Sequence, residues 1–250
     1  MHSEKEKLTI EQYRQIYKET IKHLDSEIIF MNDGFCPLDE NGYPLMTSFR
    51  LAEKYKKWQN QVLLYQKLLE TAGITTDTKG NLLEISCGLG GGITFISEYY
   101  NFDNLYGLDI LEEHINYCKH KIPNVNFIES TATNIPLENN SLDFIITVEA
   151  FFHYNPISTF LKECNRILKP KGLLCIATNY TETEKLNKLF LNTNGMKIVK
   201  IEDITQNCNI GSAISKWVVP NTTVRLAIKN DETRHFTQNS VYEIIICQKN

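Results

Sequence analysis

The sequence predicts an α/β fold built on a mainly parallel sheet. From residue 81 onward, short apolar runs recur with the length and the bounding turns of buried strands. Helical patterns separate the first five runs, and strand–helix–strand repetition is typical of a parallel sheet with crossover helices. The runs are residues 82–86, 104–110, 125–129, 143–149, 173–178, 196–205 and 241–248.

The chain before the first strand is predicted to be a helical cap. Residues 9–24 and 47–72 both show helical periodicity. Residues 28–45 lie between them and are rich in Asn, Asp, Gly and Pro, which predicts an ordered loop. This loop is either a packed connection between helices or a cover over a ligand. We therefore divide the chain into an N-terminal helical cap or substrate lid, residues 1–73, and a ligand-binding domain, residues 74–250.

Helical segments are expected between the strands of the second domain. Residues 92–100, 111–120 and 156–168 show clear helical periodicity, while the pattern of residues 131–141 is looser. Residues 206–240 have no strong strand pattern. We expect a short helix and a loop there, inserted before the last strand.

Composition and charge favour a soluble protein with reduced thiols. Of the 250 residues, 42% are apolar, and no apolar run approaches the roughly 20 residues of a membrane-spanning helix. The polar N-terminus lacks a secretory signal, and seven cysteines without a CxxC pair are typical of reduced thiols. The net charge of −4 leaves no broad basic face. We expect a cytoplasmic monomer or homodimer without membrane or nucleic-acid partners.

A glycine-rich turn follows the first predicted strand. Residues 82–92 are LLEISCGLGGG, and four of the chain's twelve glycines fall between positions 88 and 92. A turn with so few side chains lets backbone N–H groups approach a ligand closely. Asp109 ends the next strand, where a carboxylate can accept both hydroxyls of a ribose. Asp109 could equally cap the following helix, and the two roles are compatible.

The same turn argues against two common nucleotide sites. A dinucleotide fingerprint begins with glycine, but Ser86 stands at that position, and the chain has no P-loop sequence. Glu84, inside the end of the strand, would repel a pyrophosphate and suits a cationic ligand. The sequence therefore predicts a site for a ribose-containing ligand that carries a positive charge.

Four motifs in this order resemble the class I S-adenosylmethionine-dependent methyltransferases, most closely their small-molecule, type 11-like branch. The motifs are EISCGLG at 84–90, LYGLDI at 105–110, ATNIPLENNSLDFIITVEAFFHY at 132–154 and RILKPKG at 166–172. The resemblance covers residues 81–178 well, and residues 194–205 and 241–248 more loosely. It implies a Rossmann-like, seven-stranded, mainly parallel sheet with an antiparallel last strand, and S-adenosylmethionine as cofactor.

The resemblance also assigns cofactor-binding residues. Asp109 should bind the ribose, and Ile110 should pack on the adenine. The chain departs from the family at three positions, because Ser86 replaces a glycine, Thr131 replaces an Asp that bonds the adenine amine, and Phe35 replaces a Tyr. We expect the Thr131 exchange to weaken cofactor binding without abolishing it. The predicted cofactor-binding residues are Glu84, Ser86, Gly88, Gly90, Asp109, Ile110, Thr131, Ala132, Glu149 and Ala150.

The reaction implied by the resemblance is an in-line methyl transfer, and we predict no metal site. A base is needed if the acceptor atom carries a proton. His153, just past the fourth strand, is the leading candidate, since an imidazole titrates near neutrality; packing is its competing role. Glu149 is predicted at the same catalytic end, where it could instead bind an amine or the cofactor. His235 is the second candidate base.

Two segments, residues 28–45 and 206–240, are placed to cover a substrate. Their apolar side chains favour a neutral, fairly hydrophobic acceptor, and we expect O-methylation of a hydroxyl of a secondary metabolite. N- or C-methylation of a small molecule or peptide is the alternative. A scaffold or cyclase-like protein that binds the cofactor without methyl transfer is the alternative from another class. The predicted substrate residues are Phe30, Phe35, Tyr43, His153, Trp217 and His235.

Overall fold

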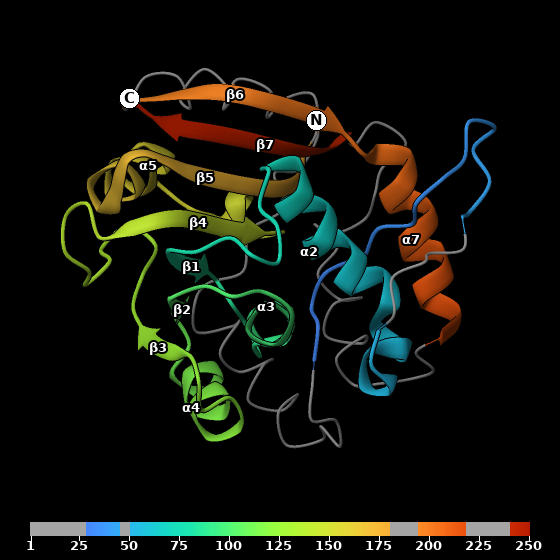
Figure 1. Ribbon diagram of the computed structural model, residues 1–250, viewed down its shortest axis with the longest axis horizontal. Helices are drawn as coiled ribbons and strands as arrows, with labels where there is room; N and C mark the ends of the chain where they lie inside the picture. The colour runs from blue at the N-terminus through green and yellow to red at the C-terminus, as the bar shows by residue number, and fades with distance from the viewer. Residues whose placement is uncertain (1–28, 46–50, 181–194, 219–240) are drawn as a thin grey trace, which may run out of the picture.

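The structure is a computed structural model that describes residues 29–45, 51–180, 195–218 and 241–250. Seven strands form one sheet in the order β3-β2-β1-β4-β5-β7-β6 (Figure 1). The strands are β1 Asn81–Ile85, β2 Asn104–Asp109, β3 Asn126–Glu129, β4 Leu142–Val148, β5 Leu168–Tyr180, β6 Met196–Asp203 and β7 Val241–Lys249. The predicted helix at 9–24 lies outside the described residues.

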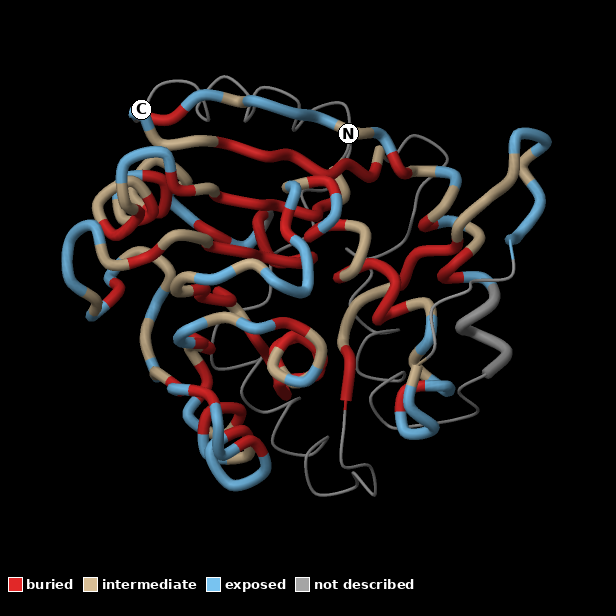
Figure 2. The backbone as a smooth tube through the Cα atoms, viewed as in Figure 1, coloured by how far each residue is buried: buried red, intermediate tan, exposed pale blue. Residues whose placement is uncertain are grey.

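The direction of the strands confirms the predicted mainly parallel sheet. The neighbours β1, β2, β3, β4 and β5 pair in parallel, whereas β7 runs antiparallel to both β5 and β6. The central strands read as continuous apolar runs because both of their faces are covered. Figure 2 shows β4, β5 and β7 as largely buried and β6 as mostly exposed along one edge.

Helices cover both faces of the sheet. They are η1 Glu53–Trp58, α2 Gln59–Thr71, α3 Gly91–Tyr99, α4 Glu112–Lys121, η2 Phe151–His153, α5 Ile157–Ile167 and α7 Thr205–Val218. Neighbouring residues of a strand point to opposite faces. Leu82 accordingly packs in one core cluster with α2, α3 and α4, while Leu83 packs in a second cluster with α5.

Two helix predictions need correction. Residues 131–141 contain turns and no helix. Arg166 of α5 donates to the backbone carbonyls of Ile135 and Leu137, at 2.7 Å each, so these carbonyls bond a guanidinium instead of the N–H groups of a helix. Within the predicted segment 47–72, described helical structure begins at Glu53 as a short 3₁₀ turn and becomes α-helical at Gln59.

The predicted loop at 28–45 is an ordered connection in its described part. The Phe35 N–H donates to the Asn60 carbonyl of α2 at 2.8 Å. Cys36 exchanges two hydrogen bonds with Asn207 of α7, at 3.1 and 2.9 Å. The segment therefore runs between α2 and α7, as Figure 1 shows in blue. The helix expected in the insert 206–240 is present as α7, and the rest of that insert lies outside the described residues. The domain boundary at residue 73 stays a prediction.

Candidate active site

A cavity of about 510 Å³ opens at the carboxyl ends of β1, β2 and β4. β1 pairs with β2 on one side and with β4 on the other, so the strand order reverses at β1. Open α/β sheets bind ligands in the crevice that forms at such a reversal. Ten predicted site residues line the cavity: Phe30, Ser86, Gly88, Asp109, Ile110, Thr131, Ala132, Glu149, Ala150 and His153.

Ser86 begins the turn after β1 in a left-handed backbone conformation, with φ of 60°. A non-glycine residue in this conformation costs roughly 1 kcal/mol, which accounts for the glycine usually found there in the family that the sequence resembles. The Ser86 hydroxyl lies 3.0 Å from the Tyr154 hydroxyl, which in turn lies 2.8 Å from the Thr147 hydroxyl. These contacts fix Ser86 in its unusual conformation, so serine can replace glycine without loss of the turn.

Gly91 and Gly92 are required by close packing. A Cβ atom at Gly92 would lie 2.1 Å from the Tyr65 ring, and one at Gly91 would lie 2.3 Å from the Ile29 carbonyl oxygen. The last two glycines of the cluster therefore let α2 and the segment around Ile29 approach the start of α3. Gly90, with φ of 79°, immediately precedes α3 and packs against α4 without lining the cavity.

Asp109, at the end of β2, is oriented by two backbone donors and lies beside His114. Its carboxylate accepts hydrogen bonds from the backbone N–H groups of Gly88, at 2.9 Å, and Leu111, at 3.0 Å. The Nδ1 atom of His114 lies 3.2 Å from the same carboxylate. Burial opposes ionisation of Asp109, but His114 and the two N–H groups outweigh it and lower the pKa of Asp109 below its usual value. Asp109 is therefore an anion with a fixed orientation at the cavity wall.

Glu84 of β1, a predicted cofactor-binding residue, is 1% exposed and does not itself line the cavity. Its Oε1 atom accepts a 2.6 Å hydrogen bond from the Tyr65 hydroxyl, and its Oε2 atom has no hydrogen-bond partner. Burial, opposed by Tyr65 and by the backbone N–H of Ile93, raises the pKa of Glu84 to about 8. The pKa values of the two carboxyl groups thus shift in opposite directions. Burial dominates at Glu84, whereas His114 and the two backbone N–H groups dominate at Asp109.

Glu149 follows β4 with a positive φ of 53°. Its Oε1 atom accepts two hydrogen bonds, from the Asp33 N–H at 2.9 Å and from the Tyr242 hydroxyl at 2.8 Å. Its own N–H donates to the Ala177 carbonyl of β5 at 2.8 Å. Glu149 therefore joins the segment before α2 to β4 and β7 at the edge of the cavity.

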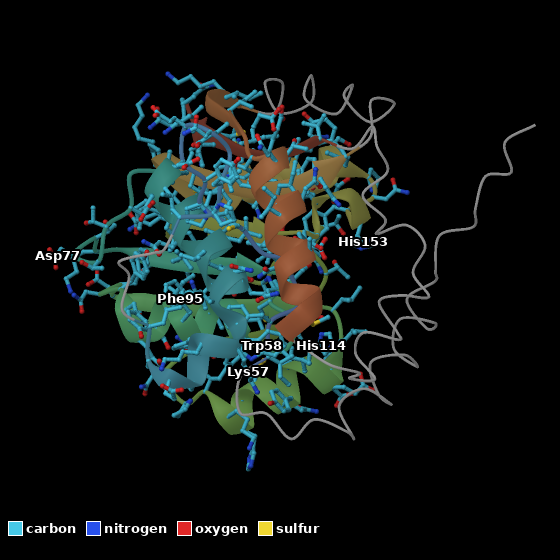
Figure 3. All side chains as sticks on the ribbon, turned by 90° about the vertical axis from the view of Figure 1, so that its right-hand side faces the viewer. Lys57, Trp58, Asp77, Phe95, His114 and His153 are labelled. Carbon is cyan, nitrogen blue, oxygen red and sulfur yellow. The ribbon has the colours of Figure 1, made fainter. Side chains whose placement is uncertain are left out.

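His153 is exposed at the end of η2, and its backbone N–H bonds the Ala150 carbonyl at 2.9 Å. Figure 3 labels His153 and His114, which lie on the side of the molecule opposite Asp77. Thr131 is exposed, and its hydroxyl lies 3.2 Å from that of Thr133. His153 is thus the exposed titratable side chain of the cavity wall within the residues described.

Two of the predicted substrate residues lie away from this cavity, and two others are not described by the structure. Phe35 is buried in the core beside α2, and Tyr43 is 69% exposed; neither lines the cavity. The side chain of Trp217 and the whole of His235 lie outside the described part of the chain. A substrate role for all four stays a prediction.

Several cavity residues were missed by the sequence analysis: Met31, Asn32, Tyr65, His114, Tyr154 and Asn155. His114 carried a detectable signal, because it lies in the first turn of α4, the helix that begins shortly after Asp109. Tyr65 carried none, since its contact with Glu84 joins a cap helix to the sheet.

The comparisons with known proteins agree with this geometry. Residues 83–176 match the family model described as "Methyltransferase domain". The fatty-acid O-methyltransferase of Mycolicibacterium smegmatis is 29% identical over 161 residues, which cover 63% of this chain and 55% of that protein. A phthiotriol/phenolphthiotriol dimycocerosates methyltransferase of Mycobacterium ulcerans is 34% identical over 110 residues, covering 43% and 39% of the two chains. The chain thus spans about half the length, or less, of these relatives.

Solved structures share the fold at low sequence identity. The cyclase SpnF superposes with a TM-score of 0.72 at 16% identity, over 97% of both chains. Geranyl diphosphate C-methyltransferase from Streptomyces coelicolor superposes with a TM-score of 0.67 at 13% identity, over 95% of this chain and 98% of the other. Identities this low support the fold and carry no conclusion about substrate.

Fold, cavity and family match agree with a class I methyltransferase domain at residues 83–176. S-adenosylmethionine is the cofactor that this match supports. The residues present fit such a cofactor. The cavity wall offers the Asp109 carboxylate to a ribose. Within the described ranges, no helix is long and apolar enough to cross a membrane.

Proposed function

We propose that this protein transfers a methyl group from S-adenosylmethionine to a hydroxyl oxygen of a small, apolar acceptor of the lipid or secondary-metabolite type. One observation carries the proposal: a single cavity brings the oriented Asp109 carboxylate together with the exposed His153 side chain. An orienting anion for the cofactor and a base for the acceptor are what a hydroxyl methylation requires of a protein.

The cofactor-binding part of the proposal rests on the wall around β1 and β2. When bound, S-adenosylmethionine supplies an electrophilic methyl group on a positively charged sulfur. Asp109 accepts hydrogen bonds from the ribose. The backbone at Gly88, which carries no side chain, borders the methionine part of the cofactor. Ile110 and Ala132 form the apolar wall for the adenine, and Thr131 offers a neutral hydroxyl at its edge.

His153 is the base in this proposal, and Glu149 is a positioning residue. The Oε1 atom of Glu149 already accepts two hydrogen bonds inside the protein, from Asp33 and Tyr242. Tyr154 is also unsuited to take a proton, because burial raises its pKa and its hydroxyl bonds Ser86 and Thr147. His153 is exposed and lines the cavity, and an imidazole is a common proton acceptor in enzymes.

The acceptor class follows from the cavity wall and from the relatives. The cavity wall includes the apolar side chains of Phe30, Val148 and Ala150, and no Lys or Arg side chain lines the cavity in the described residues. Relatives named for methylation of a fatty acid and of a dimycocerosate lipid support an apolar chain on the acceptor.

Replacement of His153 by Gln is expected to lower kcat with long-chain alcohol or phenol acceptors by about 100-fold or more, because a hydroxyl must lose its proton during attack. Carboxylic acid acceptors should be unaffected, since they are already ionised. The measurement is transfer of a labelled methyl group to matched alcohols and acids, followed by mass analysis of the product.

His120→Gln, an exposed residue of α4 outside the cavity, is the matched control. An equal loss of kcat with alcohol and acid acceptors would show that His153 is not the base. Product methylated on nitrogen or carbon would replace the oxygen assignment. Cofactor binding without any methylated product would favour a scaffold or cyclase-like role without methyl transfer.

Replacement of Tyr242 by Phe is expected to lower Tm and to weaken binding of S-adenosylhomocysteine by roughly three- to tenfold. The change removes one of the two donors that Asp33 and Tyr242 offer to the buried Glu149 Oε1, which costs about 1–3 kcal/mol and loosens the segment that contains Asp33. Calorimetry and thermal unfolding measure the two effects. Tyr106→Phe, on β2, is the control. A lower Tm with unchanged affinity would limit Glu149 to a role in stability.

A further inference from the structure

Two cysteines meet at the glycine-rich turn and take no part in the proposed methyl transfer. Cys87 belongs to the turn and lines the cavity, and Cys118 lies in α4. We propose that these two thiols form an oxidation site, at which a peroxide converts them to a disulfide and thereby weakens ligand binding in the cavity. The disulfide does not depend on the proposed function, whereas its effect on the cofactor rests on that function.

The two thiols share one backbone partner. The Cys118 thiol donates to the Gly88 carbonyl oxygen at 3.4 Å, and the Cys87 sulfur lies 4.0 Å from the same oxygen. The thiols also interact with each other, and all the described cysteines are free. Two neighbouring thiols can form a disulfide when their Cα atoms come within about 7 Å. The turn and α4 therefore bring together the two halves of a disulfide.

Glycines let the two sulfur atoms pack against the backbone. A Cβ atom at Gly90 would lie 2.9 Å from the Cys118 sulfur, and one at Gly107 would lie 3.2 Å from the Cys87 sulfur. The Cys87 N–H donates to the Leu108 carbonyl at 3.0 Å. The pair is thus enclosed by the turn, β2 and α4.

The cavity gives a small oxidant access to one member of the pair. Cys87 is 6% exposed and lines the cavity, whereas Cys118 is 0% exposed and does not line it. A peroxide that enters the cavity therefore meets Cys87 first. Cys118 is then the second thiol, which reacts from within the protein.

The reaction has two balanced steps, with hydrogen peroxide as the oxidant. The Cys87 sulfur attacks one peroxide oxygen, the O–O bond breaks, and the thiol proton leaves with the other oxygen as water, which yields a sulfenic acid. The Cys118 sulfur then attacks the Cys87 sulfur, the S–S bond forms, the S–O bond breaks, and the second thiol proton leaves as part of a second water. Two thiols lose two electrons in all, and one peroxide is reduced to two waters.

The environment of Cys87 makes the first step slow. Its contact with Cys118 and its burial raise the pKa of the Cys87 thiol. The thiolate is the reactive form, so a protonated thiol reacts slowly. The pair should therefore respond to sustained oxidation and stay reduced in a brief exposure.

A disulfide at this position would displace Gly88. A sulfur–sulfur bond is about 2.05 Å long, so the turn and α4 must move closer together. The Cys118 thiol also loses the proton that it donates to the Gly88 carbonyl. Gly88 lines the cavity, and its N–H donates to Asp109 at 2.9 Å. Movement of Gly88 therefore disturbs the carboxylate that faces the ligand.

A second cysteine pair provides a comparison within the same chain. Cys164 of α5 and Cys247 of β7 are both 0% exposed in the second core cluster, and they interact electrostatically. Neither lines the cavity. If access through the cavity selects the site of oxidation, these two thiols should stay reduced while Cys87 and Cys118 react.

The experiment is prolonged treatment of the full chain with millimolar hydrogen peroxide, followed by alkylation of the remaining thiols, digestion and mass spectrometry without reduction. We expect a peptide pair linked through Cys87 and Cys118, which dithiothreitol separates, with Cys164 and Cys247 alkylated. Absence of the linked pair would overturn the proposal. Sulfinic acid at Cys87 without linkage, or equal oxidation of Cys164 and Cys247, would overturn it as well.

Calorimetry with S-adenosylhomocysteine measures the effect on the cavity. Oxidation should weaken its affinity by about tenfold or more, because a buried carbonyl loses a donor and Asp109 loses its fixed partner, and dithiothreitol should restore it. A linked protein with unchanged affinity would contradict the effect on ligand binding. If reduced protein bound no S-adenosylhomocysteine, the methyltransferase function would fail, and the linked peptide would still decide whether the oxidation site exists.

Two variants and one protection test separate the pair from its surroundings. Cys118→Ser keeps an O–H donor for the Gly88 carbonyl, and it should give no linked peptide and keep its affinity after peroxide treatment. A dithiothreitol-reversible loss of affinity in this variant would show that Cys87 alone is responsible. Cys164→Ser is the matched control and should still form the link. Saturating S-adenosylhomocysteine should slow linkage in wild type, and an unchanged rate would contradict entry of the oxidant through the cavity.

Discussion

Replacement of Asp109 by Asn is expected to weaken binding of S-adenosylhomocysteine by about 100-fold or more. The carboxylate accepts the N–H groups of Gly88 and Leu111 and keeps further acceptor capacity toward the cavity. An amide must turn its NH₂ group toward one of these donors or toward the ligand, so one buried donor loses its partner at a cost of about 1–3 kcal/mol. Loss of the charge also weakens each hydrogen bond from a ribose.

Calorimetry at fixed pH and ionic strength measures this effect, with circular dichroism to verify the fold. Asp103→Asn is the matched control, because Asp103 accepts the Gly80 N–H at the opposite, amino-terminal edge of the sheet. It should change the affinity by less than about twofold. Retention of micromolar affinity in Asp109→Asn would contradict the placement of the ribose at this wall.

The strands could be predicted because their signal is local. β1 and β4 are covered on both faces, so burial alone makes them apolar runs bounded by turns. The helix expected at 131–141 could not be excluded in the same way. Its carbonyls at Ile135 and Leu137 bond Arg166, about thirty residues further along the chain, and no local pattern reports that contact.

In the site, likewise, some features could be predicted from local sequence and others depend on distant contacts. Asp109, Gly88 and Glu149 could be predicted because they end or follow strands of a parallel sheet, and such positions converge at one edge. Their chemical states could not be predicted. The sequence presents two acidic strand ends as equivalent, yet His114 stabilises the anion at Asp109, whereas burial beside Tyr65 favours a protonated Glu84.

The glycine cluster shows how one motif combines separate requirements. Gly88 and Gly90 have positive φ, of 53° and 79°, and meet the needs of the turn. Gly91 and Gly92 instead meet a packing requirement set by the segment at Ile29 and by Tyr65. The sequence shows the cluster but does not show that half of it faces the N-terminal part of the chain.

Replacement of Gly92 by Ala is therefore expected to destabilise the protein by roughly 2–4 kcal/mol and to abolish cofactor binding. A Cβ atom would lie 2.1 Å from the Tyr65 ring, a distance that forces the ring or α3 to move. Movement of the ring also breaks its 2.6 Å hydrogen bond to Glu84, so the effect reaches the cavity. Thermal and urea unfolding measure the first effect, and S-adenosylhomocysteine titration measures the second.

A loss of stability in Gly92→Ala would point to the contact with Tyr65, because helix propensity alone would make this substitution stabilising. Gly92 is the second residue of α3, and in a helix alanine is favoured over glycine by up to about 1 kcal/mol. Without the contact to Tyr65, Gly92→Ala would stabilise the protein. Tyr65→Leu in the Gly92→Ala background removes the ring atoms that the Cβ meets, so it should recover part of the lost stability, with a coupling energy of about 1 kcal/mol or more. It should not recover cofactor affinity, because leucine cannot donate to Glu84. Additive effects of the two substitutions would show that the close approach of α2 and α3 is not what requires glycine at position 92.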